Sequence, residues 1–382
     1  MSFNKKLSLA FLFIGFTIPQ IVYGTDMEDL YKKGMIHYNQ KSYREAAILF
    51  EEAAKTNPKA LNALAAMYQQ GEYFQQDYKQ AEKYYLKAFE GGVKNAGFNL
   101  GLMYKSEKSG LKNYAKALSY FQPLAQEGNE RATKQVQQMC NKALQEEASK
   151  WDPKTITDLG KICYHGSIIA QDVDKAKSLF QKAMTLGSED AQFCLAVLYV
   201  EGKGVPQDFT TARKLWYALA QKGNTDAMIN IGQTYTNVMW PTGTRSENIQ
   251  KGVQWFKTAA NKGNTQAMIL LAEAHTTGIG ALKNTTHAKE LLEKAEKQGA
   301  SVLGHLGAVY LAEGNNEKAL KLWKEGASKD DACSLYNLGV IYCNGQGVEK
   351  DLKKAGEYLQ KSANLGYPMA QQFYEQYKKY FN

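Results

Sequence analysis

The chain has 382 residues and a formal net charge of +9, with 47 lysines and arginines against 38 acidic residues. The basic surplus is mostly lysine, and no dense arginine run or nucleic-acid-binding fingerprint accompanies it, so we expect no nucleic-acid partner. A solvated, lysine-rich helix surface explains the charge, which would also favour weak contact with anionic phospholipids such as phosphoinositides.

At the beginning of the chain, residues 1–24 have the pattern of a secretory signal peptide. Lys5 and Lys6 precede an apolar run from Leu7 to Ile18, and small or apolar residues occupy the usual cleavage spacing up to Gly24. An uncleaved membrane anchor is the alternative, but an apolar core of about a dozen residues is short for a span of ~20. We therefore expect cleavage after Gly24, a mature chain without a transmembrane segment, and a secreted or periplasmic location.

The rest of the chain repeats one pattern, which can be anchored on the small residue of a Leu-Gly or Leu-Ala type pair. The nine anchors are Gly34, Ala65, Gly101, Gly160, Ala196, Gly232, Ala272, Gly307 and Gly339. A second small residue follows sixteen positions after six anchors, twelve after Gly34 and Gly307, and twenty after Gly232. The copy from Ala191 to Ala227 indicates two amphipathic helices joined by a glycine turn. One such hairpin cannot bury its apolar face alone, so neighbouring copies must stack.

The turns of two copies carry a family resemblance, since Gly202–Val205 is followed by Asp208 and Gly345–Val348 by Asp351. Copies with the sixteen-residue spacing resemble Sel1-like repeats, a tetratricopeptide-related form with a longer turn between its helices. Copies with the spacing of twelve resemble the plain tetratricopeptide repeat. The resemblance covers essentially the whole mature chain. It implies an all-α fold, an α-solenoid superhelix of about nine helix-turn-helix repeats, with a concave face lined by first helices.

The repeats are interrupted at three places, which suggest a domain organisation. After the signal peptide we expect three repeats in residues 25–131, an extra helix and hinge in 132–153, six repeats in 154–369 and a capping helix in 370–382. The pair Asp152-Pro153 is the candidate hinge. A loop from Asn237 to Asn248 contains Trp240, whose ring we expect to tuck back onto its repeat rather than face a partner.

The residues that could support catalysis fall at structural positions of the repeat. His37, His275 and Cys163 stand three residues after an anchor, where six other copies have tyrosine, so they are interpreted as packing substitutes. His287 is expected to face solvent and His305 to make a polar contact between neighbouring copies. Cys163 and His165 are two apart, and such residues do not face each other on a helix.

Reactive motifs are also missing from the sequence. It contains no His-Glu-x-x-His, Cys-x-x-Cys, Gly-x-Ser-x-Gly or phosphate-binding loop. Some cysteine-rich Sel1-like relatives bind or hydrolyse β-lactams, but their regular cysteine pair in each repeat is absent here. We therefore predict a non-enzymatic protein with no catalytic residues, metal or cofactor.

Five cysteines are present, and an odd number leaves at least one unpaired. Cys333 and Cys343 lie ten residues apart on one predicted helix, which places them about 15 Å from each other and prevents a disulfide. We expect mostly buried thiols, although export would permit bridges.

A partner is expected on the concave surface formed by the first helices. Side chains three before, one after and four after each anchor should face it, and they mix aromatics with amides and lysines. Much of the aromatic surface is expected to serve packing between repeats. The predicted contact residues are Tyr38, Phe98, Lys105, Lys161, Tyr164, Phe193, Gln233 and Tyr336.

These features predict an exported scaffold that binds other proteins. The chain resembles the exported bacterial host-entry group (LpnE/EnhC-like), which implies a virulence role in host-cell entry or trafficking through host proteins or peptides. The first alternative is a periplasmic helper of cell-envelope assembly, and the second is a β-lactam-binding or hydrolysing enzyme. A eukaryotic luminal adaptor is a further alternative, but neither a membrane anchor nor a retention signal supports it.

Overall fold

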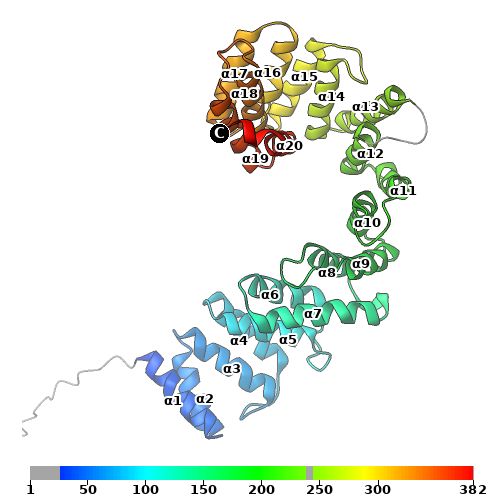
Figure 1. Ribbon diagram of the computed structural model, residues 1–382. Coiled ribbons are helices and arrows are strands. Elements are labelled where there is room, and N and C mark those ends of the chain that lie inside the picture. The colour runs from blue at the N-terminus through cyan, green and yellow to red at the C-terminus, as the bar shows by residue number, and fades with distance from the viewer. Residues whose placement is uncertain (1–25, 238–243, 382) are drawn as a thin grey trace, which may run out of the picture. The chain divides into compact units, whose positions relative to one another are not determined.

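The computed structural model describes residues 26–237 and 244–381, and the regular structure of that part is helical (Figure 1). The predicted signal peptide and Trp240 lie outside the described residues. The first helices of the repeats are α1 (Met27–Asn39), α3 (Pro58–Gln70), α5 (Lys94–Lys105), α8 (Pro153–His165), α10 (Glu189–Glu201), α12 (Thr225–Asn237), α14 (Thr265–Thr277), α16 (Leu303–Ala312) and α18 (Ala332–Asn344). The second helices are α2 (Tyr43–Ala53), α4 (Tyr78–Glu90), α6 (Tyr114–Gln126), α9 (Val173–Thr185), α11 (Phe209–Gln221), α13 (Arg245–Asn261), α15 (Thr285–Lys297), α17 (Asn316–Ser328) and α19 (Leu352–Asn364). The prediction of an all-α solenoid is confirmed.

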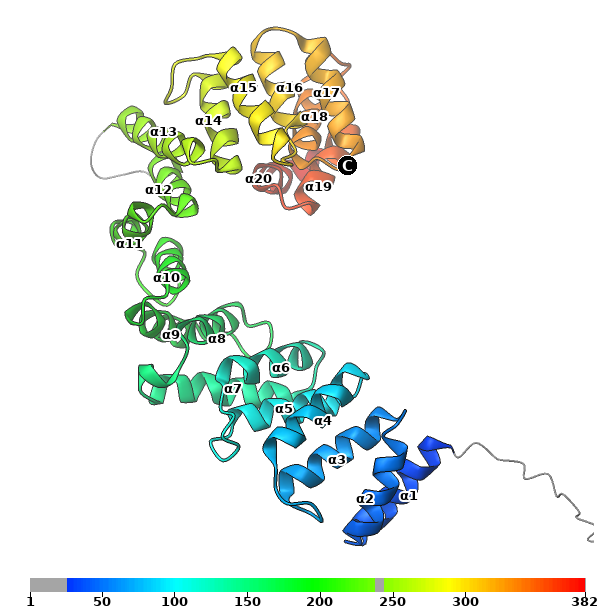
Figure 2. The same ribbon diagram turned by 180° about the vertical axis from the view of Figure 1, so that it is seen from behind.

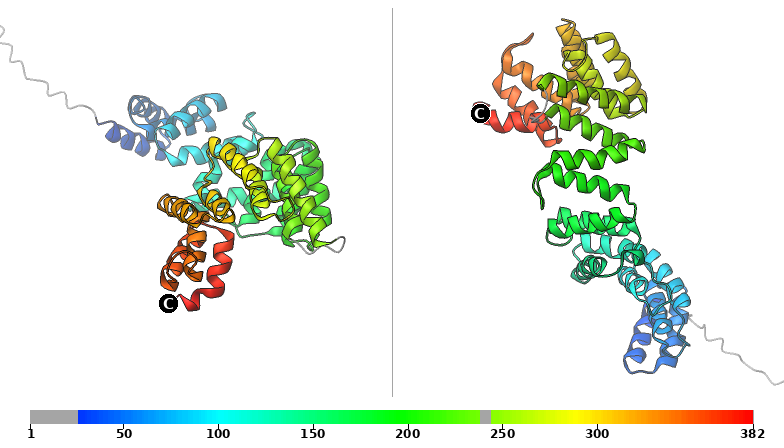
Figure 3. Two further views of the ribbon diagram at one scale, coloured as in Figure 1. Left: turned by 90° about the horizontal axis from the view of Figure 1, so that it is seen from above. Right: turned by 90° about the vertical axis from the view of Figure 1, so that its right-hand side faces the viewer.

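Contacts divide the chain into two units. The first extends up to Glu146 and includes residues 150–155 and 166–170, whereas the second includes 147–149, 156–165 and the chain from Gln171 onward. Within the first unit α3 packs on α4, and α4 on α5. Within the second unit the first helices α14, α16 and α18 contact one another in succession, and Figures 1 and 2 show α16, α17 and α18 side by side. The right-hand view of Figure 3 shows the green helices of the second unit following one another in a stack.

The small anchor residues mark the points where the two helices of a repeat cross. A Cβ atom built on Gly101 would lie 2.5 Å from the ring of Phe121, and one built on Gly307 would lie 2.2 Å from Trp323. The same relation joins the following pairs: Gly34 and Phe50, Gly160 and Phe180, Gly232 and Phe256. Each bulky partner is fully or almost fully buried, so the glycine provides the space that the large side chain fills.

The sixteen-residue spacing corresponds to one turn structure. In each of these six repeats, the residue that caps the second helix donates its backbone N–H to the carbonyl oxygen three residues after the anchor. The six bonds are Asp77 to Tyr68, Asn113 to Tyr104, Asp172 to Cys163, Asp208 to Tyr199, Asn284 to His275 and Asp351 to Tyr342, all between 2.8 and 3.0 Å. Since the turn uses only the backbone of the acceptor, tyrosine, histidine and cysteine can occupy that position.

The predicted extra helix is α7 (Glu130–Gln145), which is followed by the short 3-10 helix η1 (Ala148–Lys150). After it, Trp151 stacks on Tyr114 with ring centroids 3.8 Å apart and donates from Nε1 to Glu146 at 2.9 Å. Asp152 then accepts the backbone N–H of Thr155 at 2.9 Å, so the Asp-Pro pair begins α8. Whether this point is a hinge stays a prediction.

The C-terminal segment forms α20 (Pro368–Tyr377) and the 3-10 helix η2 (Lys378–Tyr380). The helix starts two residues before the predicted bound because Pro368 occupies its first turn. It covers Tyr336 of α18, whose ring lies 5.4 Å from Tyr367 and 6.4 Å from Phe373. The C-terminal segment therefore covers the aromatic side chain that the last repeat presents at Tyr336.

Candidate partner-binding surface

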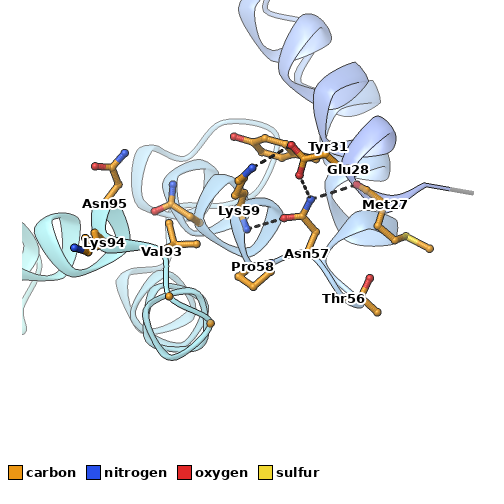
Figure 4. A pocket seen from close by; sticks show the side chains of 13 residues that line it. Met27, Glu28, Tyr31, Thr56, Asn57, Pro58, Lys59, Val93, Lys94 and Asn95 are labelled. Atoms are coloured by element: carbon orange, nitrogen blue, oxygen red, sulfur yellow. Dashed lines mark hydrogen bonds and ion pairs between the residues drawn. The ribbon is translucent and has the colours of Figure 1, made fainter.

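A candidate site in the first unit is an open groove of about 710 Å³ at the N-terminal ends of α1, α3 and α5 (Figure 4). Its walls come from successive repeats and from the turns that precede α3 and α5. The side chains combine amides and charges with a smaller apolar set. The residues used below are Met27, Glu28, Tyr31, Asn57, Pro58, Lys59, Asn62, Val93, Lys94 and Asn95.

Asn57 holds one wall of the groove together. It precedes Pro58 at the start of α3, and its side-chain oxygen accepts the backbone N–H of Lys59 at 2.9 Å. Its amide nitrogen donates to Glu28 Oε2 at 3.0 Å and to the carbonyl oxygen of Met27 at 3.4 Å. Glu28 also contacts Lys59 Nζ at 3.1 Å, as Figure 4 shows. These contacts tie the beginning of α1 to the beginning of α3.

The hydrogen bonds of Glu28 also affect its ionisation. The hydrogen bond from Lys59 and then that from Asn57 lower the pKa of the Glu28 carboxyl below its usual 4.5. The carboxylate is therefore the form present at neutral pH, and the groove carries one negative and two positive side chains, the latter being Lys59 and Lys94. Lys94 contacts Glu127 at 2.7 Å.

Replacing Asn57 with alanine is expected to lower the free energy of unfolding by about 1–2 kcal/mol, because one buried side chain provides both the helix cap and the link to α1. Native-state hydrogen exchange would measure this as faster exchange in α1 and α3. Asn113→Ala is a matched control, since Asn113 caps α6 through Lys116 N and is exposed. Equal effects of the two substitutions would contradict the role of Asn57 in joining the helices.

The floor of the groove is formed by a close backbone approach. A Cβ atom at Gly91 would lie 2.5 Å from Pro58, so the turn before α5 sits directly against the start of α3. Deeper along the first helices, Asn99 donates to Asn62 at 3.4 Å, which links α5 to α3. Tyr31 packs its ring on Phe50 with centroids 6.0 Å apart and presents the remaining edge to the groove.

The side chains of this groove suit the binding of a peptide. Amide side chains both donate and accept hydrogen bonds, as a peptide backbone does, and the apolar surface of Tyr31, Pro58 and Val93 can take its side chains. Histidine, cysteine and serine do not occur among the residues that line the groove.

Two of the predicted contact residues in the first unit are engaged by the next repeat. Tyr38 donates its hydroxyl to Glu72 at 2.6 Å, and burial together with this bond raises the Tyr38 pKa. Lys105 donates to Gln138 at 3.0 Å and to Gln135, both on α7. Burial lowers the pKa of the Lys105 ammonium, with the charge of Lys142 adding to the effect. These side chains are half-exposed, so their role toward a partner stays a prediction.

Lys161 and Tyr164 make comparable contacts in the second unit. Lys161 Nζ lies 3.5 Å from Asp190 Oδ2, and Tyr164 donates its hydroxyl to Glu201. The Lys203 ammonium lies 5.6 Å from the centre of the Tyr164 ring. Both positions therefore bridge α8 to the following repeat.

The remaining predicted contact residues differ in how much surface they offer. Phe98 is only 5% exposed, packs on Phe121 and lies under the guanidinium of Arg131 at 4.3 Å, so its ring presents little surface to a partner. Phe193 packs against Trp216 and is half-buried. The side chain of Gln233 is half-buried on α12, and Tyr336 is covered by α20 as described above.

The groove itself lies outside this predicted set, because most of its lining comes from the first turns of the helices and from the loops before them. Helical periodicity identifies Tyr31 and Asn62, which stand three residues before their anchors, but not Met27, Lys59 or Asn95. The Asn57-Pro58 pair was the available signal, since an N-cap residue followed by proline marks the start of a helix.

Two histidines pack against each other beside the turn between α14 and α15. His275 donates from Nδ1 to the carbonyl oxygen of Leu282 at 2.9 Å, and the centroid of its ring lies 4.9 Å from that of His287. His287 is half-exposed and pairs with Glu290 at 3.1 Å. Among the described residues, no group of three or more His, Cys, Asp or Glu side chains has a geometry that could hold a metal ion.

Comparison with known families gives eight matches to one repeat model, the Sel1 repeat. The matched residues are 58–93, 96–129, 153–188, 189–224, 225–264, 265–299, 303–331 and 334–367. The chain belongs to the Sel1 repeat family. The matches begin at α3 and follow the helix pairs, whereas α1 and α2 form a pair that the family model does not match.

Curated relatives of this Sel1 repeat protein include two negative regulators of exopolysaccharide production. The one from Rhizobium meliloti (strain 1021) is 28% identical over 158 residues, which are 38% of this chain and 59% of that protein. The one from Rhizobium leguminosarum bv. viciae is 24% identical over 160 residues, 39% of this chain and 60% of that protein. The similarity thus spans about three-fifths of these curated relatives.

Solved structures of Sel1 repeat proteins are also similar. A protective antigen of uropathogenic Escherichia coli strains is 26% identical, with a TM-score of 0.46 and coverage of 93% of this chain and 80% of that chain. A Sel1 repeat protein from Oxalobacter formigenes is 22% identical, with a TM-score of 0.33 and coverage of 88% and 99%. In the part of this chain that the structure describes, no helix has both the length and the apolar character needed to cross a membrane.

Proposed function

We propose that this Sel1 repeat protein is a non-enzymatic scaffold that binds an extended segment of a partner protein in the groove at the start of α1, α3 and α5. The observation that carries the proposal is the combination of amide, charged and apolar side chains from three successive repeats in one open groove. Repeats of this kind generally mediate protein–protein interaction through the surface that their stacked helices create. An extended segment suits the groove because Asn62 and Asn95 can each pair with a peptide backbone.

The setting of this activity is part of the proposal. The pattern of residues 1–24 favours export, and the resemblance to exported host-entry proteins favours a virulence role in host-cell entry or trafficking. Partners would then be host proteins or peptides. The lysine surplus favours an additional weak contact with anionic lipid head groups.

A photo-crosslinking experiment tests the groove directly. A benzophenone amino acid placed at Asn95, which is exposed and lines the groove, is expected to capture a defined partner from host-cell lysate. The matched control position is Lys83, which is exposed on the second helix α4 of the same unit and outside the groove. Capture from Lys83 but not from Asn95 would contradict the proposed surface. The substitution Asn62→Ala is expected to reduce the yield at Asn95 by about tenfold, corresponding to the loss of one or two hydrogen bonds.

A second candidate function follows from the curated relatives, which are named as negative regulators of exopolysaccharide production. In that case the partner would be a component of the cell envelope, as in the predicted alternative of an envelope-assembly helper. Deletion of the gene separates the two: increased exopolysaccharide with normal host entry supports the envelope role, and reduced host entry with unchanged exopolysaccharide supports the first. Covalent labelling of the purified chain by a fluorescent penicillin would instead support the β-lactam alternative.

A further inference from the structure

Three helices of the second unit and the segment before α20 form a cluster around a thiol and an imidazole, outside the proposed partner groove. His305 of α16 lies between Glu273 of α14 and Cys333 of α18, with its Nδ1 atom 3.0 Å from Glu273 Oε1 and 3.9 Å from Cys333 Sγ. The hydroxyl of Tyr367, the residue that precedes α20, lies 3.7 Å from the same sulfur. Asn337 Nδ2 lies 3.5 Å from it. Three donor groups therefore converge on Cys333.

The contacts of the imidazole favour its protonated form. Burial by itself lowers the pKa of His305, but its hydrogen bonds with Cys333 and Glu273 outweigh burial and raise that pKa from 6.5 to about 10. The side chain of His305 is 16% exposed, whereas the side chain of Glu273 is 46% exposed. The carboxylate of this pair is therefore more exposed to solvent than the imidazole.

The backbone adds to this environment. Cys333 is the second residue of α18, where the helix dipole and the backbone N–H groups favour negative charge. The Asp331 carboxylate caps the same helix, but it accepts the backbone N–H of Ser334 at 2.9 Å and the Ser334 hydroxyl. Gly304 lets the sulfur reach this position, since a Cβ atom there would lie 2.7 Å from Cys333 Sγ.

We propose that Cys333 is the oxidant-sensitive thiol of this chain, activated by His305 and placed so that its oxidation releases the C-terminal helix α20. The oxidant is a small peroxide such as hydrogen peroxide. The sulfur attacks one peroxide oxygen, the O–O bond breaks, and the thiol is oxidised to a sulfenic acid while the peroxide is reduced. The departing hydroxide takes up the proton that the thiol loses, so that water is the second product.

The effect on α20 follows from the packing around the sulfur. Gly304, Asn337 and the Tyr367 hydroxyl lie against Cys333, which is 8% exposed, so we expect an added oxygen to displace one of these neighbours. Tyr367 caps the start of α20 and packs its ring on Tyr336. We therefore expect the added oxygen to displace Tyr367. This displacement would expose the aromatic surface that α20 covers.

The chain contains matched control thiols. Cys194 and Cys343 also carry free thiols and are more exposed than Cys333. Burial raises the pKa of both thiols, and no imidazole is recorded against either sulfur among the described contacts. If exposure alone determined reactivity, these two cysteines would react before Cys333.

The first arm of the test measures sulfenic acid formation at each cysteine of the full chain by dimedone trapping and mass spectrometry after a brief peroxide treatment. Cys333 is expected to react at least about tenfold faster than Cys194 and Cys343, because His305, Asn337 and Tyr367 contact its sulfur, whereas burial raises the pKa of the other two thiols. His305→Gln is expected to lower the rate at Cys333 by about tenfold, and the control His287→Gln, which removes a surface histidine paired with Glu290, should leave it unchanged. Equal rates at the three cysteines would overturn the proposal.

The second arm measures the release of α20. Hydrogen exchange within residues 368–377 is expected to rise after peroxide treatment of the native sequence and to stay constant in Cys333→Ala. The variant Tyr367→Phe keeps the ring and removes only the hydroxyl, so it tests the donors around the sulfur even if the His305 variant misfolds. We expect a lower rate of sulfenic acid formation at Cys333 and a native circular dichroism spectrum. An unchanged rate in a natively folded Tyr367→Phe chain would argue against activation of the sulfur by these donors. Unchanged exchange in α20 despite complete oxidation of Cys333 would overturn the release.

Discussion

Trp323→Ala is expected to lower the free energy of unfolding of the α16–α18 region by about 3–5 kcal/mol, the range for removal of a buried large aromatic side chain. The indole is 2% exposed and fills the space that Gly307 leaves open at the crossing of α16 and α17. Its Nε1 atom also donates to the carbonyl oxygen of Gly304 at 2.9 Å. The substitution thus creates a cavity and removes this hydrogen bond.

Because a repeat contacts mainly its neighbours, the loss should stay local. Native-state hydrogen exchange is the appropriate measurement, since a long repeat array need not unfold in one step. Exchange should accelerate in α16, α17 and α18 and stay unchanged in α1–α6. Tyr217→Ala provides the comparison, since Tyr217 is 52% exposed on α11 and its loss should cost no more than about 1 kcal/mol. A similar cost at both positions would show that the crossing does not depend on the buried indole.

Gly101→Ala is expected to destabilise the α5–α6 pair by about 1–3 kcal/mol, although the same change in an exposed helix interior usually stabilises by about 1 kcal/mol. The added Cβ atom would lie 2.5 Å from Phe121, which is fully buried and cannot move away. The two helices must then separate or the ring must leave its preferred rotamer. Chemical denaturation followed by hydrogen exchange in α5 and α6 would measure the change.

A second substitution distinguishes overpacking from other causes. The repeat formed by α14 and α15 has Ala272 and Leu292 at the two equivalent positions, both almost completely buried. The double variant Gly101→Ala with Phe121→Leu reproduces that combination and is expected to be more stable than Gly101→Ala alone. A double variant whose loss equals or exceeds the sum of the two single losses would rule out a steric conflict between these side chains.

Repeat spacing was enough to predict the helix pairs. The distance of sixteen residues between small positions corresponds to one backbone turn, which is closed by hydrogen bonds such as that from Asp208 N–H to the Tyr199 carbonyl oxygen. This spacing can be read from the sequence without knowing how the two helices pack. The extra helix between Gly101 and Gly160 could also be predicted, because the distance between these anchors is longer than one repeat and the additional residues are too many for a turn. Turn length and helix spacing are local features of the sequence, and they recur in each repeat, so they can be predicted without the tertiary structure.

The candidate sites were not predicted, because their residues are not separated by the repeat length or by a helical period. The groove depends on Met27, Asn57 and Lys94, which come from the ends of three helices and the turns between them. Phe98 was predicted from its helical position to face a partner, but Arg131 of the extra helix covers it. The Cys333 cluster was not predicted either, because its members come from α14, α16, α18 and the segment before α20.

The sequence by itself therefore determined the helices, their pairing and the family, since each follows from hydrophobic period, glycine turns and caps within about 36 residues. Only the tertiary structure decided which polar side chains meet, for example that Glu273, His305 and Cys333 lie together across three repeats. The physical reason is that stacking aligns positions of successive repeats. Which side chains then touch depends on the rotation and approach of each helix, and single small residues such as Gly304 determine these.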